Sequence, residues 1–168
     1  MSATKDTSKS INLTLLSVVI FLAVVAIWIG VRLISPDSPT LFAGTQPENL
    51  GVTNETLTAC PSTPNCVSSQ SKDGEHSIQP LAYQGEGKTA IATLKEIISQ
   101  QERSKIVSES DDYLYAQFTT QWMGFVDDVE FYVNEENGVI DVRSASRLGE
   151  SDLGVNRERI ETIRQAFQ

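Results

Sequence analysis

The stretch GFVDDVEFYVNEENGVIDVRSASR, residues 124–147, carries the clearest fold signal of the chain. Alternating or β-rich runs cover 127–134 and 139–146, which is typical of strands. Asn137-Gly138 stands between the two runs and favours a two-residue hairpin turn, because both turn positions need positive φ. The stretch therefore predicts an antiparallel hairpin.

The position of this turn sets the register that we expect for the hairpin. A two-residue turn pairs Glu136 with Val139. Counting outward predicts Val133–Val142, Phe131–Ser144 and Val129–Ser146 on an apolar face, and Tyr132–Arg143, Glu130–Ala145 and Asp128–Arg147 on the other. A shift by one residue would move Asp128 and Glu130 to the apolar face. We therefore expect Glu130, both arginines and the tyrosine ring to form one cluster.

The segments on either side of the hairpin complete an α+β domain. Further β-rich runs lie near 104–109 and 112–120, and residues 88–101 have one apolar stripe at helical spacing. A closing helix follows Gly154, with Asn156 expected as its cap. Each helix must bury its stripe, and the nearest surface is one face of the sheet. We predict a four-stranded antiparallel sheet with two helices on one face and the other face free.

An apolar segment near the N-terminus predicts a membrane anchor. Leu13 to Val31 is a run without charge and is long enough to span a bilayer. No small-residue cleavage site follows it closely, so we favour an uncleaved signal-anchor over a signal peptide cut after Ala43. Lys5 and Lys9 outweigh Asp6, which predicts a cytoplasmic N-terminus. We expect a cytoplasmic tail at 1–10, a single-pass transmembrane helix at 11–34, a flexible linker at 35–59 and an extracytoplasmic, periplasmic-type domain at 60–168.

The charge distribution limits the partners of this domain. The net charge of −9 argues against nucleic-acid binding, which needs a basic surface. Residues 60–142 carry five Lys or Arg against fourteen Asp or Glu, whereas residues 143–168 carry five Arg against four acids. A small anionic ligand would therefore bind in the C-terminal quarter. The other partners that we expect are the membrane and a membrane protein.

Cys60 and Cys66 are the only cysteines of the chain. In an oxidising compartment they would pair, and closing so short a loop would add about 2 kcal/mol of stability. Two alternatives are a reactive thiol and a zinc site with His76 and either Asp73 or Glu75, although structural zinc sites usually space cysteines more closely. We predict the disulfide, no metal and no cofactor.

The densest polar stretch of the chain is the candidate site. Its residues are Asp127, Asp128, Glu130, Arg143, Ser144, Ser146, Arg147, Ser151, Asp152, Asn156 and Arg157. Carboxylates could bind a hard cation or serve as acid and base, while arginines and hydroxyls at a helix N-terminus could hold an anion. The same residue types also form purely structural networks of ion pairs and caps, and this second interpretation is the one we favour.

Trp122-Met123-Gly124-Phe125 gathers three large apolar side chains in a connection between strands. Such a tip can contact lipid or a partner. We expect instead that these side chains fold back over the core, because large apolar side chains are buried where they can be. Their exposure in the folded protein distinguishes the two.

Three segments resemble a known family, the domain of unknown function 1499. They are PNCVSS at 64–69, GFVDDVEF at 124–131, and VRSASR at 142–147 running on into SDLGVNR at 151–157. The family usually has Ser where this chain has Thr63. The resemblance covers the chain from about Cys60 to its end, and it implies that the three segments share one domain. It implies no activity.

The sequence favours a membrane-tethered accessory or binding domain of unknown function that is not an enzyme. One alternative is an enzyme, such as a hydrolase or isomerase, that uses carboxylates of the Asp127–Glu130 segment. It would need a cleft that excludes water around at least two of Asp127, Asp128, Glu130 and Asp152. Another is a structural subunit of a membrane complex that makes contact through Trp122, Met123 and Phe125. Convergence of the polar segments in a pocket would favour a ligand or chemistry.

Overall fold

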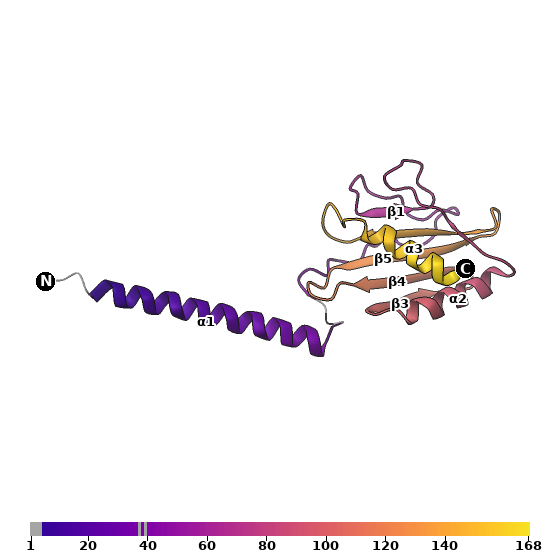
Figure 1. Cartoon of the computed structure of the whole chain (residues 1–168). Helices are drawn as coiled ribbons and strands as arrows, with labels where there is room; N and C mark the ends of the chain where they lie inside the picture. Colours follow the sequence, from indigo (N-terminus) through magenta and orange to yellow (C-terminus); the bar gives the residue numbers. More distant parts are fainter. Residues whose placement is uncertain (1–4, 37, 39) are drawn as a thin grey trace. The chain divides into compact units, whose positions relative to one another are not determined.

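A computed structural model of the chain describes residues 5–36, 38 and 40–168. They divide into two compact units, the first ending at Ser38 and the second at Gln168. The first unit is helix α1, Lys5–Ile34 (Figure 1). Within the described residues, Asn12–Ile34 is the one helical segment long and apolar enough to cross a membrane. Its 23 residues extend about 35 Å at the helical rise, which exceeds the apolar thickness of a bilayer.

The second unit contains one antiparallel sheet with the strand order β1-β6-β5-β4-β3, and β2 pairs with the same edge of β6 as β1 does. The strands are β1 Cys66–Ser68, β2 Leu81–Ala82, β3 Ser104–Glu109, β4 Tyr113–Thr119, β5 Val126–Asn134 and β6 Val139–Ser146. The predicted count of four strands was wrong, because the sheet has six. The additional strands β1 and β2 are too short to show a period of two, and they form because the edge of β6 offers them backbone partners.

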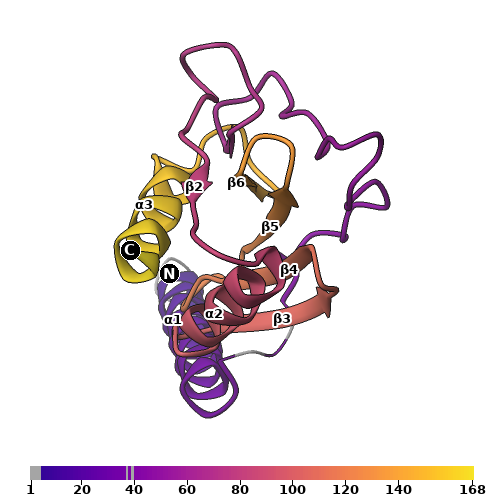
Figure 2. The ribbon, with the colours of Figure 1, turned by 90° about the vertical axis from the view of Figure 1, so that its right-hand side faces the viewer.

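Two helices of the second unit pack on one face of this sheet, as predicted. They are α2, Gly87–Ser99, and α3, Val155–Phe167 (Figure 2). Buried residues of both helices share one core with the alternate residues of β4, β5 and β6. That core includes Leu94, Ile98, Leu114, Phe131, Val142, Ile160 and Ile163. The apolar stripes of both helices are therefore buried against the sheet, as their spacing predicted.

The β5–β6 hairpin keeps its predicted faces but not its predicted register. The observed pairs include Phe131–Val142, Glu130–Arg143 and Asp128–Ala145, each displaced by two positions. The turn is longer than the expected two residues and occupies 135–138, where the amide of Asn137 donates to Asn134 Oδ1 at 3.1 Å. Within this turn, only Gly138 has a positive φ, at 65°. A shift of two leaves every side chain on its face, so Asp128 and Glu130 stay opposite the helices.

The sheet face away from the helices is covered, and the expectation that it is free was wrong. Residues 40–59, which we expected to belong to a linker, run along this side (Figure 2). The amide of Gly51 donates to Glu130 Oε1 at 2.7 Å, and the amide of Leu57 donates to Gln70 Oε1 at 2.8 Å. Leu57 itself is buried. These two contacts of the segment are made by backbone amides, which leave no periodic pattern in the side chains.

Candidate functional site

Two arginine–carboxylate pairs lie on the covered polar face of the sheet. Arg147 binds both oxygens of Asp128, with Nε–Oδ2 at 2.9 Å and Nη2–Oδ1 at 2.7 Å. Arg143 Nη1 donates to Glu130 Oε2 at 3.2 Å. The side chains of all four residues are buried. We call this group the polar-face cluster. Buried pairs with this many hydrogen bonds hold strands in place, but they offer no open position to a ligand.

Two tyrosines complete the polar-face cluster. The Tyr113 hydroxyl donates to Glu130 Oε1 at 2.8 Å, and the Tyr115 hydroxyl donates to Asp128 Oδ1 at 2.5 Å. Burial, with the neighbouring carboxylate adding to it, raises the pKa of Tyr115 to about 12 and also raises the pKa of Tyr113. Both hydroxyls therefore stay protonated and donate. Their alternation on β4 places them on the same face as Asp128, and this signal could have identified them from the sequence.

The guanidinium groups of the polar-face cluster are bound unequally. The hydrogen bonds from Arg147 to Asp128 raise the pKa of Arg147, so its charge is permanent. Arg143 Nε, in contrast, is the one buried side-chain nitrogen or oxygen without a hydrogen-bond partner in the described part of the chain. An unsatisfied buried donor is unfavourable, so the Arg143–Glu130 pair stabilises the fold less than the Arg147–Asp128 pair.

Asp127, Ser144 and Ser146 lie on the opposite face of the sheet, where Asn156 of α3 contacts both serines. Asp127, Ser144 and Asn156 meet around Arg159, a residue that the sequence did not single out. Arg159 donates to Asp127 Oδ2 at 2.5 Å, to Asn156 Oδ1 at 2.6 Å and to Ser144 Oγ at 3.1 Å. Its guanidinium also lies 4.8 Å from the centroid of the Phe118 ring. The helical spacing of three from Asn156 was the available signal for Arg159.

Asn156 occupies the centre of this second cluster. Its Nδ2 donates to the Asn65 carbonyl and to Ser146 Oγ, both at 3.0 Å, and its Oδ1 accepts from Ser144 Oγ at 2.5 Å. It is therefore a fully buried bridge from α3 to β6 and to Asn65, the residue before β1, rather than the cap that we expected. The Asp152 carboxylate accepts from the amide of Asn156 at 2.7 Å, and Asp152 therefore satisfies an amide in the first turn of α3 in place of Asn156.

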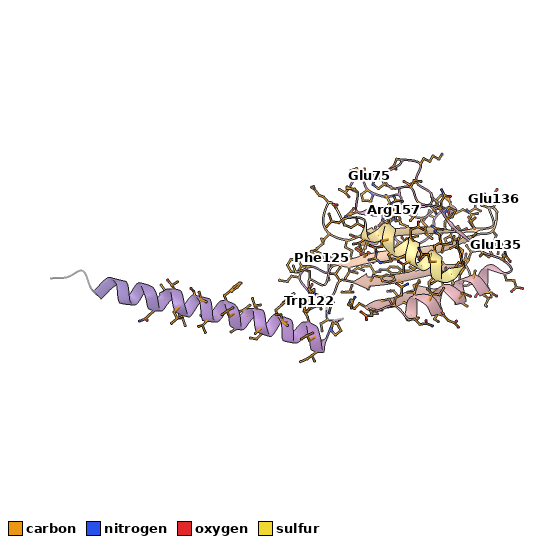
Figure 3. The ribbon with its side chains drawn as sticks, viewed as in Figure 1. Glu75, Trp122, Phe125, Glu135, Glu136 and Arg157 are labelled. Carbon is orange, nitrogen blue, oxygen red and sulfur yellow. A yellow bond between two sulfur atoms is a disulfide. The ribbon has the colours of Figure 1, made fainter. Side chains whose placement is uncertain are left out.

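Ser151 and Arg157 do not join either cluster. Ser151 Oγ accepts from the amide of Leu153 at 3.3 Å and is exposed. Arg157 donates to the carbonyls of Ser77 at 2.7 Å and Glu75 at 2.8 Å, and so ties α3 to the loop before β2 (Figure 3). The eleven candidate residues thus divide between two faces of the sheet and its end, and the adjacent Asp127 and Asp128 point in opposite directions.

A hollow of about 290 Å³ lies at the end of the sheet where β5 begins and β6 ends. Four of the predicted site residues line it, namely Asp127, Ser146, Ser151 and Asp152. Much of the remaining lining is apolar, from Phe125, Leu148, Leu153 and Val155. Two carboxylates share this hollow, but Asp127 is bound by Arg159 and Asp152 by the amides of Gly154 and Asn156.

The same end of the sheet carries exposed apolar side chains. We call Leu41, Phe42, Trp122, Met123, Leu148 and Leu153 the apolar end. Trp122 is 50% exposed and Met123 is 41% exposed, so the expectation that they fold back over the core was wrong for both. Phe125 is partly buried, with its ring centroid 5.5 Å from that of Phe42.

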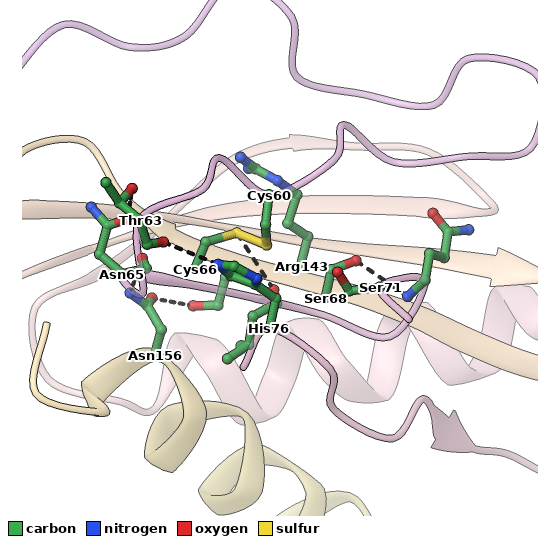
Figure 4. Close-up of a disulfide and its surroundings, with 12 residues drawn as sticks. Cys60, Thr63, Asn65, Cys66, Ser68, Ser71, His76, Arg143 and Asn156 are labelled. Atoms are coloured by element: carbon green, nitrogen blue, oxygen red, sulfur yellow. Dashed lines mark hydrogen bonds between the residues drawn. A yellow bond between two sulfur atoms is a disulfide. The ribbon is translucent and has the colours of Figure 1, made fainter. Parts of the chain in front are cut away.

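We call residues 40–59 the covering segment. Cys60, the next residue of the chain, forms a disulfide with Cys66 of β1 and so ties the end of the covering segment to the sheet (Figure 4). His76 lies beside it, with Nδ1 2.7 Å from Asp73 Oδ1 and Nε2 3.2 Å from the Thr63 carbonyl. Burial opposes protonation of His76, but these hydrogen bonds prevail and raise its pKa. With both sulfurs joined, the zinc alternative loses its two thiolates. Among the described residues, no three His, Cys, Asp or Glu side chains are grouped so that they could hold a metal ion.

The fold and site define a small α+β domain in which two charged clusters join a sheet to its coverings, preceded by one apolar helix. The chain belongs to the family described as "Protein of unknown function (DUF1499)", which matches residues 56–167. This match confirms the resemblance read from the three sequence segments. No curated protein matches the chain.

Proposed function

We propose that this protein is a single-pass membrane protein that holds a binding or accessory domain on the extracytoplasmic side and has no catalytic role. The anchor rests on the apolar length of Asn12–Ile34, and the orientation rests on the basic residues Lys5 and Lys9. The Cys60–Cys66 disulfide fits an oxidising compartment.

One observation carries the non-catalytic part of this proposal. Asp127, Asp128 and Glu130 are each bound by an arginine inside the fold, and they lie on two opposite faces of the sheet. A catalytic acid and base must reach one substrate, so Asp127 cannot act together with Asp128 or Glu130 on the opposite face. Asp128 and Glu130 share a face, but each is held by a buried arginine. These contacts support a structural role for the segment.

Two measurements test the proposal. Reporters fused after Gln168 should be active when they need an extracytoplasmic location and silent when they need the cytoplasm; the reverse result would overturn the orientation. Asp127→Asn and Asp128→Asn should each lower the free energy of unfolding, because a buried arginine loses its partner. A catalytic carboxylate behaves differently, since its neutralisation often leaves stability unchanged or higher. Unchanged stability would favour the enzyme alternative.

A small-molecule site in the hollow is a second candidate function, and the shared lining by Asp127 and Asp152 favours it. Because the charged groups there are carboxylates, and only Asp127 is neutralised by an arginine, we expect a neutral or cationic group with apolar parts rather than the anion first considered. Small amines and alcohols can be screened by thermal shift. Compounds that stabilise the native chain but not Ser151→Trp, which fills the hollow, would support this site.

A further inference from the structure

The six side chains of the apolar end come from three segments far apart in the sequence, at 41–42, 122–123 and 148–153. Figure 3 shows Trp122 and Phe125 at one end of the domain and Glu135 and Glu136 at the other. Leu41 and Leu153 are 94% and 95% exposed. Monomeric soluble proteins seldom expose a group of large apolar side chains in one place unless it is an interaction surface.

Specific contacts hold these three segments together. Thr40 Oγ1 donates to the Met123 carbonyl at 2.8 Å. Gly44 has a φ of 66° and approaches so closely that a Cβ atom there would lie 2.9 Å from Cβ of Arg147 and 3.1 Å from Cγ of Leu148. The Phe42 ring packs on Phe125. The apolar end is therefore a built surface, since a hydrogen bond, a close glycine contact and a ring contact fix the segments that present it.

Leu153 adds evidence that this surface is used. It is a bulky residue with a φ of 57°, a backbone conformation that such residues rarely adopt. Its side chain makes almost no contact within the domain, because it is nearly fully exposed. A strained backbone that presents an apolar side chain to solvent gains nothing for the isolated fold, and such strain is usually found at functional positions.

The chain itself identifies what covers the apolar end. Only five residues, at 35–39, separate Ile34 at the end of α1 from Thr40, and an extended chain advances at most about 3.6 Å per residue. If α1 spans a bilayer, the residues that Thr40 contacts cannot be far from the lipid surface. Trp122 is suited to this location, because tryptophan is enriched where lipid meets water.

The charge of this surface points to lipid insertion rather than electrostatic attraction. The segments at 40–43, 120–125 and 147–155 contain one basic residue, Arg147, whose guanidinium is bound to Asp128, and two acidic residues, Glu150 and Asp152, so they offer no basic patch to anionic lipid. We propose that the apolar end docks into the outer lipid leaflet and inserts Trp122, Met123, Leu41 and Leu153 among the headgroups and upper acyl chains. This inference rests on the proposed anchor. It predicts docking on neutral lipid that is insensitive to salt.

Tryptophan fluorescence tests this docking in the full-length chain, because the chain has two tryptophans, Trp28 in α1 and Trp122. Trp28→Phe leaves Trp122 as the sole reporter, and Trp122→Phe leaves Trp28. Each variant is reconstituted in phosphatidylcholine vesicles with ordinary or brominated acyl chains, which quench tryptophan inside the bilayer. Emission from Trp122 should fall about twofold in brominated lipid, as for an interfacial side chain.

A third variant is the matched control. Trp28→Phe, Trp122→Phe and Glu136→Trp together place the sole tryptophan on the exposed hairpin at the opposite end of the sheet, where brominated lipid should not quench it. Quenching equal to that of Trp122 would overturn the proposal, because the domain would then have no preferred end.

The outcomes separate this inference from the proposed anchor. Quenching of Trp122 and not of Glu136→Trp supports the docking. Quenching of Trp28 without quenching of Trp122 overturns the docking and leaves the anchor. An unquenched Trp28 overturns the anchor, whatever Trp122 does. If Trp122 is unquenched in pure lipid but shielded from acrylamide in native membranes, a protein partner covers the apolar end and the lipid proposal is wrong.

Discussion

Arg147 donates to both carboxylate oxygens of Asp128, from Nε at 2.9 Å and from Nη2 at 2.7 Å, across the end of the β5–β6 hairpin. The two residues are not paired in the ladder, where Asp128 lies opposite Ala145. The long arginine side chain reaches diagonally back over the polar face from the position after β6. The contact therefore joins the last residue of the hairpin to the sheet beneath the covering segment.

The first prediction concerns the stability that this pair supplies. Arg147→Met should lower the free energy of unfolding by about 3 kcal/mol, because it leaves the buried Asp128 carboxylate without its partner. The double variant with Asp128→Asn should lose less than the sum of the two single changes. Chemical denaturation measures all three.

An exposed ion pair provides the control for this prediction. Lys88 and Asp111 lie 2.9 Å apart with both side chains mostly exposed, so Lys88→Met should change stability by about 0.5 kcal/mol or less. If Arg147→Met behaves like Lys88→Met, the polar-face cluster is solvated and its structural role is wrong.

The second prediction concerns the disulfide. Protein taken from its native compartment should resist alkylation of Cys60 and Cys66 until it is reduced. Replacing both by serine should lower the free energy of unfolding by about 2 kcal/mol, since the unfolded chain loses a short closed loop. Free thiols before reduction, or bound stoichiometric zinc, would contradict this prediction.

The third prediction is a pH dependence that comes from His76, the one histidine of the chain. Its pKa in the folded protein lies above the unfolded value of 6.5, so its contribution to stability is complete below pH 6.5 and is lost as pH rises through the folded pKa. Denaturation at about pH 6 and about pH 8 should show the loss.

Asp73→Asn tests the origin of this pH dependence. The hydrogen bonds that it accepts from His76 hold the pKa of Asp73 well below its usual range, so the carboxylate is charged throughout that window. Removing its charge should bring the pKa of His76 down and flatten the dependence. An unchanged slope would mean that another group titrates.

The fourth prediction concerns the covering segment. The amides of Gly51 and Leu57 should exchange slowly with solvent deuterium, because each donates to a side chain of the domain. Glu130→Gln should speed exchange at Gly51 more than at Leu57, since of these two amides only that of Gly51 donates to Glu130. Fast exchange at both amides in the native chain would show that residues 40–59 behave as a linker in solution.

The long elements could be predicted from the sequence, and the candidate site only in part. Asp128, Glu130, Arg143 and Arg147 do meet on one face, because a register error of two leaves side-chain direction unchanged. Asp127 was grouped with them by adjacency, although adjacent strand residues point to opposite faces. Arg159 was missed because two of its partners, Asp127 of β5 and Ser144 of β6, lie more than ten residues away along the chain, and only Asn156 is a near neighbour.

Taken alone, the sequence specified the apolar helix, the hairpin, the two amphipathic helices and the face of the sheet that they cover. These follow from periods of two and about 3.6 residues, which are local properties of the chain. Only the tertiary structure resolved the four-residue turn, the short strands β1 and β2 and the burial of the polar face. The short strands and the burial of the polar face depend on distant segments finding hydrogen-bond partners, which leaves no periodic pattern in the side chains. The turn is local, and its length is accompanied by a side-chain contact from Asn134 to the amide of Asn137 that the Asn-Gly signal did not predict.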